Sequence, residues 1–273
     1  VSILPENNRD DLSYANCDDD LNRICEGLEH CVEDTGIALA TISDNNFFME
    51  VKKDYDPSMI TAFIRLNGNT IGCVANRCAV YGEDGEKAAE YAPVLNSKGC
   101  RKAAEFVDFC DAFNIPILTL VNVTGYKADK CSEKTMAKSA AKLTYSFANA
   151  SVPKVTVIIG QAYGTAYLTM ASKAIGTDIV YAWPTAAIGM MDATAAAKIM
   201  YADEIKESDH AVSLISEKAA EYQDLQSSAQ AAARRGYVDD IIKAEETRQR
   251  VIAAFEMLFT KRENRPSKKH GTV

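Results

Sequence analysis

Largely apolar runs and helix-period stripes alternate along the middle of this chain. Residues 117–121 and 155–159 are short runs rich in β-branched side chains, which is typical of strands covered on both faces. Residues 97–113 and 133–150 instead carry apolar side chains at helical spacing. Strands that alternate with helices predict a mostly parallel sheet with right-handed crossovers, and therefore the α/β class.

The flanking segments predict further elements. The pattern at 59–77 is two β-rich runs around Asn67-Gly68, which is a strong hairpin signal. Asp192 is the predicted N-cap of a helix over 193–201, and Gly160 is predicted to end the strand that starts at Val155. The remaining expectations are a short helix at 21–28, a helix end, turn and strand over 40–58, a strand at 178–182, a helix over 207–235 broken near 225–227, a short strand or turn at 236–241 and a helix over 245–260.

The segment 97–113 has two apolar stripes. One contains Cys100, Ala103, Val107 and Cys110, and the other contains Phe106, Phe109 and Phe113. A helix with two apolar stripes is expected to be covered on two sides.

A strand-to-helix corner stands out at residues 155–170. The apolar strand is followed by Gly164, Thr165 and Ala166, which open a predicted helix. The first N–H groups of a helix lack intrahelical partners and carry partial positive charge, so this corner could hold an oxygen atom that gains negative charge. The alternative is an ordinary buried strand–helix unit whose small residues serve packing alone, and the pattern by itself leaves both open.

Composition limits the class of protein. The 273 residues include 38 acidic and 30 basic side chains, for a net charge of −8, which argues against nucleic-acid binding. Apolar runs stay well below the ~18 residues of a transmembrane helix, and the N-terminal segment has no export signal. We therefore expect a cytoplasmic protein. The chain starts at Val1, which is compatible with one part of a longer polypeptide.

Side-chain chemistry gives little support for other enzyme classes. The eight cysteines show no C-x-x-C pair, so reduced, buried thiols are expected rather than a metal site. The three histidines lie in charged or terminal contexts, where solvent exposure is expected. The sequence lacks a G-x-S-x-G elbow, a P-loop and a G-x-G-x-x-G motif. A reaction carried out by this chain would therefore depend on backbone donors.

Several segments resemble the biotin-dependent acyl-CoA carboxyltransferase family. The family includes the β subunits of propionyl-CoA carboxylase-type enzymes and the α subunits of methylmalonyl-CoA and glutaconyl-CoA decarboxylases. The matching segments, in family order, are FVDFCDAFNIP (106–116), VNVTGY (121–126), ASVPKVTVI (150–158), AYGTAY (162–167), YAWPTA (181–186) and RGYVDDII (235–242).

The resemblance implies a fold and a place in a larger enzyme. It implies a crotonase-like superhelix of ββα units forming a single domain over 1–273, namely the C-terminal carboxyltransferase domain, with a mobile tail at 261–273. The expected partners are an N-terminal carboxyltransferase domain or subunit and a biotin carboxyl carrier protein, in a homo- or hetero-oligomer. A place in a membrane decarboxylase complex is also compatible with the family.

The resemblance also assigns site residues. The backbone amides of Thr165 and Ala166 match the family's oxyanion hole for biotin, with Gly164 beside them. Gly125 and Tyr126 match the facing loop, and Leu168 matches a position that lines the acyl pocket. The implied cofactor is carboxybiotin on a carrier protein and the implied substrate is an acyl-CoA, with no metal. Carboxyl transfer places negative charge on a thioester enolate and on a ureido oxygen, and both need preorganised N–H donors.

Three positions depart from the family motifs. Thr165 replaces a glycine, Thr124 replaces the proline of the facing loop, and Leu168 replaces a polar residue of propionyl-specific members. We expect a stiffer corner at Thr165 and a looser loop at Thr124.

Two other functions remain as alternatives. A crotonase-type CoA hydratase or isomerase would need an acid near 184–189, where Ala187 stands instead. A non-catalytic domain that scaffolds an oligomer or binds the biotinyl carrier would need no chemistry at all.

Overall fold

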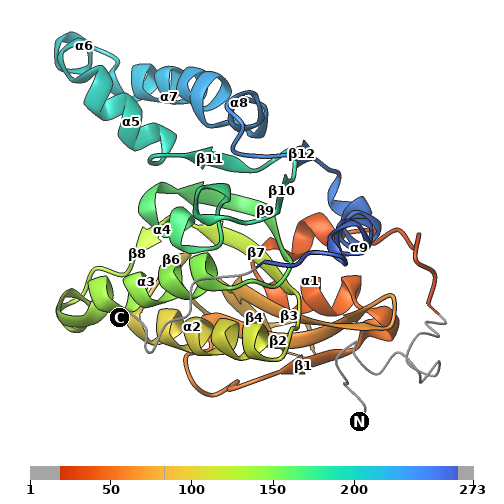
Figure 1. The fold of residues 1–273 in the computed structure, drawn as a ribbon. Helices are drawn as coiled ribbons and strands as arrows, with labels where there is room; N and C mark the ends of the chain where they lie inside the picture. Colours follow the sequence, from red (N-terminus) through yellow and green to blue (C-terminus); the bar gives the residue numbers. More distant parts are fainter. Residues whose placement is uncertain (1–18, 83, 264–273) are drawn as a thin grey trace.

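The computed structural model describes residues 19–82 and 84–263. Most of the predicted tail, from residue 264 onward, therefore lies outside the described residues. In the described part the chain forms one large mixed sheet covered on both faces by helices (Figure 1). This arrangement confirms the predicted α/β class.

The main sheet has the strand order β1-β2-β3-β7-β9-β10-β12, and β11 adds to the far end of β9. Strands β1 to β3 are antiparallel, whereas β3, β7, β9, β10 and β12 run parallel. The strands of this sheet are β1 (Phe48–Glu50), β2 (Met59–Leu66), β3 (Asn69–Asn76), β7 (Ile117–Val123), β9 (Lys154–Tyr163), β10 (Ile179–Ala182), β11 (Ala187–Gly189) and β12 (Asp240–Ile241). Two small pairs, β4 (Ala79–Tyr81) with β5 (Lys87–Glu90) and β6 (Val94–Leu95) with β8 (Gly125–Tyr126), lie outside it.

The strand predictions are mostly confirmed. The hairpin pairs Leu66 with Asn69 across the Asn67-Gly68 turn, and β7 is buried along its whole length. The prediction that Gly160 ends β9 is wrong, because the strand continues to Tyr163. The reason is that a bulge, rather than a turn, contains this glycine.

The helices enclose the sheet in two layers. Helices α2 (Ser97–Ala112) and α3 (Lys130–Asn149) cover one face, where Val107, Leu143 and Phe147 are buried in one core cluster. Helices α1 (Thr35–Ile42) and α9 (Thr247–Leu258) cover the other face around Leu39 and Val251. Both clusters consist of apolar side chains that are buried from water. Burial of apolar surface is the dominant favourable contribution to folding.

The helix α4 (Gly164–Thr169) lies at the sheet edge, next to β9. Four further helices, α5 (Ala193–Met200), α6 (Ala202–Glu207), α7 (Ala211–Tyr222) and α8 (Ala229–Arg234), form an extension beyond β11, at the top of Figure 1. Asp192 Oδ1 accepts the N–H groups of Thr194 and Ala195, which confirms it as the N-cap of α5. The expected break near 225–227 is a π-helical turn, Gln223–Ser227.

Two helix predictions need correction. Residues 21–28 form turns, and the short 3₁₀ helix begins only at Leu28. In the second apolar stripe of α2, Phe106 is only 6% exposed, whereas Phe109 and Phe113 are 45% and 52% exposed, so this stripe is covered only in part. The ring of Phe109 lies 6.2 Å from that of Phe63 on β2 and 4.6 Å from that of Phe113. None of the described helices is long and apolar enough to cross a membrane.

Candidate functional site

Two loops meet where β7 and β9 end at the carboxyl edge of the sheet. One carries Gly125 and Tyr126, and the other is the start of α4. The Tyr126 hydroxyl donates to the carbonyl oxygen of Thr165 at 3.1 Å and lies 2.8 Å from Thr169 Oγ1. The structure therefore brings the predicted facing loop against the predicted backbone donors.

Gly164 makes the corner between β9 and α4 possible. Its φ of +58° is in the left-handed region that favours glycine. A Cβ atom on this residue would also lie 3.1 Å from the carbonyl oxygen of Met190. A side chain here would therefore strain the backbone and crowd the residue that follows β11.

The amides at the start of α4 are not capped by the described protein. The N–H groups of Thr165 and Ala166 have no hydrogen-bond acceptor within residues 19–82 and 84–263, and no side chain caps the helix. Thr165 is exposed and Leu168 is 40% exposed, whereas Ala166 is only 1% exposed, so the Thr165 side of the helix end faces the surface. The open donors are the feature that an oxyanion-binding corner requires.

Two of the three departures from the family motifs, Thr165 and Thr124, can be compared with their expected effects on the backbone. Thr165 takes a helical conformation, so the corner forms despite its β-branched side chain. The expected loosening at Thr124 is wrong. Its N–H and its hydroxyl both donate to the carbonyl oxygen of Pro93, at 2.7 and 3.0 Å, and a proline would have no N–H to give.

Gly125 differs from Gly164 in what it requires. A Cβ atom on Gly125 would have no neighbour within 4 Å, and its φ is not positive. The residue pairs with Val94 in the short β6–β8 ladder. Neither the space around Gly125 nor its backbone conformation requires a glycine at this position.

The site offers backbone groups rather than an ionised base. Burial raises the pKa of Tyr167 to about 12 and also raises that of Tyr163, so both phenols are protonated at neutral pH. The side chain of His30 is 83% exposed, and His210 is exposed as well. Among the described residues no cluster of acids, histidines and cysteines could hold a metal ion.

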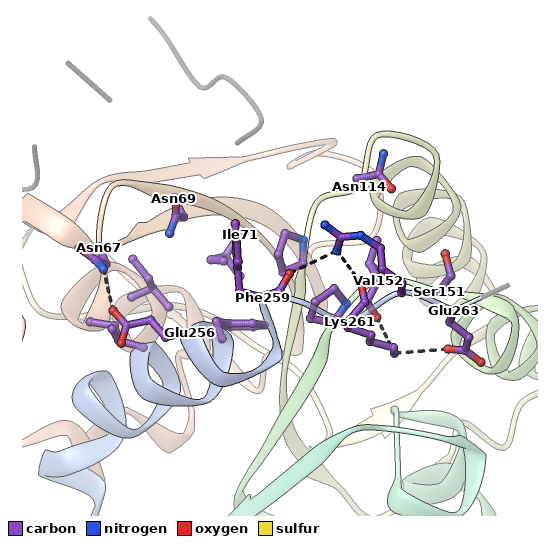
Figure 2. A pocket seen from close by; sticks show the side chains of 16 residues that line it. Asn67, Asn69, Ile71, Asn114, Ser151, Val152, Glu256, Phe259, Lys261 and Glu263 are labelled. Carbon is purple, nitrogen blue, oxygen red and sulfur yellow. Dashed lines mark hydrogen bonds and ion pairs between the residues drawn. The ribbon is translucent and has the colours of Figure 1, made fainter. Parts of the chain in front are cut away.

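A large groove lies at the opposite, amino edge of the parallel strands (Figure 2). It has a volume of about 830 Å³ and is lined by Pro116 and Pro153, which precede β7 and β9, and by residues of α9. Asn67 Nδ2 donates to Glu256 Oε1 across it at 2.8 Å. None of the residues that the sequence predicts for the site lines this groove, so we do not place the chemistry there.

Two residues beside the corner are not predicted from the sequence. Met190 places its carbonyl oxygen against Gly164, and Asn122 lies at the end of β7 with its side chain bonded to β9. The sequence pattern could have indicated Asn122, because it is a polar side chain at the carboxyl end of a buried strand. No pattern could have indicated Met190, because only its backbone oxygen matters.

The fold is that of an α/β protein of the crotonase type, and the corner between β9 and α4 offers backbone N–H groups without a partner in the described structure. The chain belongs to the carboxyl transferase domain family, whose model matches residues 1–273. It is 39% identical to the methylmalonyl-CoA carboxyltransferase 12S subunit of Propionibacterium freudenreichii subsp. shermanii, over 99% of this chain and 51% of that protein. It is 40% identical to the propionyl-CoA carboxylase beta chain of Cereibacter sphaeroides, over 100% of this chain and 52% of that one.

Solved structures agree with this assignment. The crystal structure of transcarboxylase 12S with methylmalonyl-coenzyme A bound matches with a TM-score of 0.85 and 38% identity, over 99% of this chain and 52% of that one. The beta subunit of geranyl-CoA carboxylase from P. aeruginosa, at 24% identity, shares the fold with a TM-score of 0.67, over 84% of this chain and 42% of that one. The chain thus spans about half the length of the relatives it matches.

Proposed function

We propose that this chain is the biotin-binding half of an acyl-CoA carboxyltransferase, in the position of the C-terminal carboxyltransferase domain. The observation that carries the proposal is the pair of unpartnered amides, Thr165 and Ala166, behind the left-handed Gly164. The family and the names of the relatives support the same chemistry.

The corner fits an oxygen that bears negative charge. Two N–H groups on adjacent residues point from the first turn of α4, where the helix dipole adds to their field. Biotin, when bound, supplies a ureido ring that carries the carboxyl group. The amides of Thr165 and Ala166 hold the oxygen of that ring, and one such donor is worth ~3 kcal/mol in other enzymes.

The neighbouring residues orient and limit the site. Tyr126 fixes the backbone of Thr165 through its hydroxyl, and Gly125 leaves room in front of the donors. Leu168, one turn into α4, faces the surface and lines the acyl pocket of the acyl-CoA.

A second chain or domain completes the enzyme. The partners we infer are an N-terminal carboxyltransferase half and a biotin carboxyl carrier protein. The open position of Thr165 and Leu168 at the surface is consistent with a site that another unit covers. The 12S relative is described as a hexamer that binds substrate in a multienzyme core, and we infer an oligomer here too.

The alternatives have less support. The stretch that would carry the acid of a hydratase or isomerase contains Ala187, which is 7% exposed and paired with β9 in β11. A pure scaffold would not need amides that are left open at a left-handed corner. The relatives include both a carboxyltransferase subunit and a methylmalonyl-CoA decarboxylase alpha subunit, so transfer in either direction fits the family.

A complementation assay tests the proposal. The chain is mixed with the N-terminal half of a related 12S-type subunit, complex formation is verified, and transfer of labelled carboxyl from a carboxylated biotin carrier to propionyl-CoA and butyryl-CoA is measured. We expect transfer from the mixture and none from either half alone. A verified complex that binds the carrier without transfer would support the scaffold alternative, and transfer by the chain alone would contradict its assignment as a half.

A further inference from the structure

The two loops of the candidate site leave the sheet next to a bulge between β7 and β9. Val121 pairs with Ile158, but Val123 pairs with Ala162. The ladder therefore advances two residues on β7 and four on β9, so β9 has two additional residues opposite Asn122. A bulge redirects the strand that contains it, and the redirected strand here leads directly into α4.

The side chain of Asn122 fills this bulge. Its Oδ1 accepts the N–H of Gln161 at 3.0 Å, and its Nδ2 donates to the carbonyl oxygen of Val32 at 3.4 Å. A Cβ atom on Gly160 would lie 2.6 Å from this Oδ1 and 2.9 Å from Cγ. Gly160 is thus required because the carboxamide of Asn122 occupies the space of a side chain.

Asn76, the last residue of β3, holds the backbone of Asn122 in turn. The N–H of Asn122 donates to Asn76 Oδ1 at 2.9 Å, and Asn76 Nδ2 donates to the carbonyl oxygen of Asn122. The last backbone pair between β3 and β7 is Ala75 with Leu120, so the Asn76 side chain extends this ladder by one residue. The two side chains, only 2% and 8% exposed, form what we call the asparagine clamp.

We propose that the asparagine clamp positions the backbone donors of Thr165 and Ala166, an inference whose catalytic part depends on the proposed function. Asn122 precedes Gly125 by three residues, and its partner Gln161 precedes the first residue of α4 by three. One carboxamide therefore fixes the origin of both loops. The Tyr126–Thr165 hydrogen bond then joins the loops at their tips.

The clamp acts through the backbone and touches no reacting atom in this account, so its residues are positioning residues. A displacement of about 1 Å at a catalytic group can lower a rate by about 10²-fold. We therefore expect Asn122→Ala to lower kcat by about 10- to 100-fold while KM for the acyl-CoA stays within about twofold. Asn122→Asp keeps an acceptor oxygen for Gln161 and is the conservative variant expected to recover most of kcat.

The first experiment needs no activity. In the ¹⁵N-labelled chain, the amide resonances of Thr165 and Ala166 are compared among wild type, Asn122→Ala, Asn122→Asp and Leu39→Ala. The last variant truncates a fully buried side chain of α1 on the other face of the sheet and controls for loss of stability. We expect large shifts in Asn122→Ala alone. Unmoved resonances in a folded Asn122→Ala variant would overturn the clamp.

The second experiment measures kcat in the complemented enzyme and adds Gly160→Ala. This variant alone should lower kcat, because its methyl group displaces the Asn122 side chain, and it should add little in an Asn122→Ala background. Moved resonances with an unchanged kcat would refute the positioning role. If the wild type shows no transfer, the proposed function fails, and the resonances still decide whether the clamp holds the corner.

Discussion

Gly164 and Gly125 both lie in the candidate site, but only Gly164 has a backbone conformation that requires glycine. Gly164 has a positive φ and a backbone oxygen 3.1 Å from a would-be Cβ, whereas Gly125 has neither constraint. We expect Gly164→Ala to lower the free energy of unfolding by about 1–2 kcal/mol, because a left-handed conformation strains an alanine. Gly125→Ala should change it by less than about 0.5 kcal/mol. Urea denaturation followed by circular dichroism measures both, and equal losses would contradict the geometry of the corner.

Ionisation of the Cys78 thiol makes the stability of the folded chain depend on pH in the alkaline range. Burial, with a contribution from Glu33, raises the pKa of this thiol from 9.0 to about 11. The folded chain thus keeps a proton that the unfolded chain loses above pH 9, so this contribution to stability falls as the pH rises from about 9 to about 11. Cys78→Ser has no ionising thiol and should show a shallower fall over that window. Denaturation midpoints at pH 8, 9, 10 and 11 test this, and identical slopes would contradict it.

At the scale of elements, Arg248 connects α9 to the layer beneath it. Its guanidinium is fully buried, donates to Asp44 Oδ1 and to the carbonyl oxygen of Ile42, both at 2.7 Å, and also reaches the carbonyl oxygen of Asp20. Asp44 itself is 4% exposed. Removing one partner of a buried ion pair leaves the other charge unpaired.

We expect Arg248→Met to lower the free energy of unfolding by about 3–5 kcal/mol, since Asp44 would lose its counter-charge. The matched control is Arg250→Met on the same helix. The Arg250 side chain is 49% exposed and its ion pairs with Glu246 and Asp240 are 3.6 and 3.8 Å long, so a change below about 1 kcal/mol is expected. Similar losses of unfolding free energy in both variants would show that the buried ion pair contributes no more to stability than the exposed ones.

The elements show what periodicity can predict and where it ends. The hairpin at Asn67-Gly68, the strand at 117–121 and the cap at Asp192 follow from local chemistry, and all three are confirmed. The course of β9 past Gly160 depends on a side chain of β7, which is 38 residues earlier in the chain (160 − 122). A local pattern contains no information on such a contact.

The sequence likewise predicts some features of the candidate site and not others. Motif resemblance places Gly125, Tyr126 and Thr165 in one site, and the Tyr126–Thr165 hydrogen bond shows that they lie together. Whether the amides at 165 and 166 are open depends on the absence of nearby acceptors in the described structure, which no spacing rule provides. The exposure of Phe109 likewise follows from which elements pack nearby, and a two-stripe pattern could not predict it.

At the scale of the whole molecule, the sheet and the extension of α5 to α8 differ in burial. Strands β7 and β9 are almost wholly buried, whereas α6 and α7 have no buried residue. Local stability follows buried contacts. Native-state hydrogen exchange should therefore protect amides of β7 and β9 at least about 10²-fold more than those of α7 in the isolated chain. Equal protection would show that the extension folds together with the sheet as one cooperative unit.

The central claim is that main-chain amides, without an ionisable side chain, stabilise the charge that develops in the reaction. Thr165→Pro deletes one of these amides, and since this N–H has no acceptor in the described structure, no hydrogen bond of the fold is lost. Thr165→Ala keeps the amide and is the control. In the complemented enzyme we predict a fall of about 10²–10³-fold in kcat for Thr165→Pro and a change within a few-fold for Thr165→Ala. Wild-type turnover by a folded Thr165→Pro variant would contradict the account.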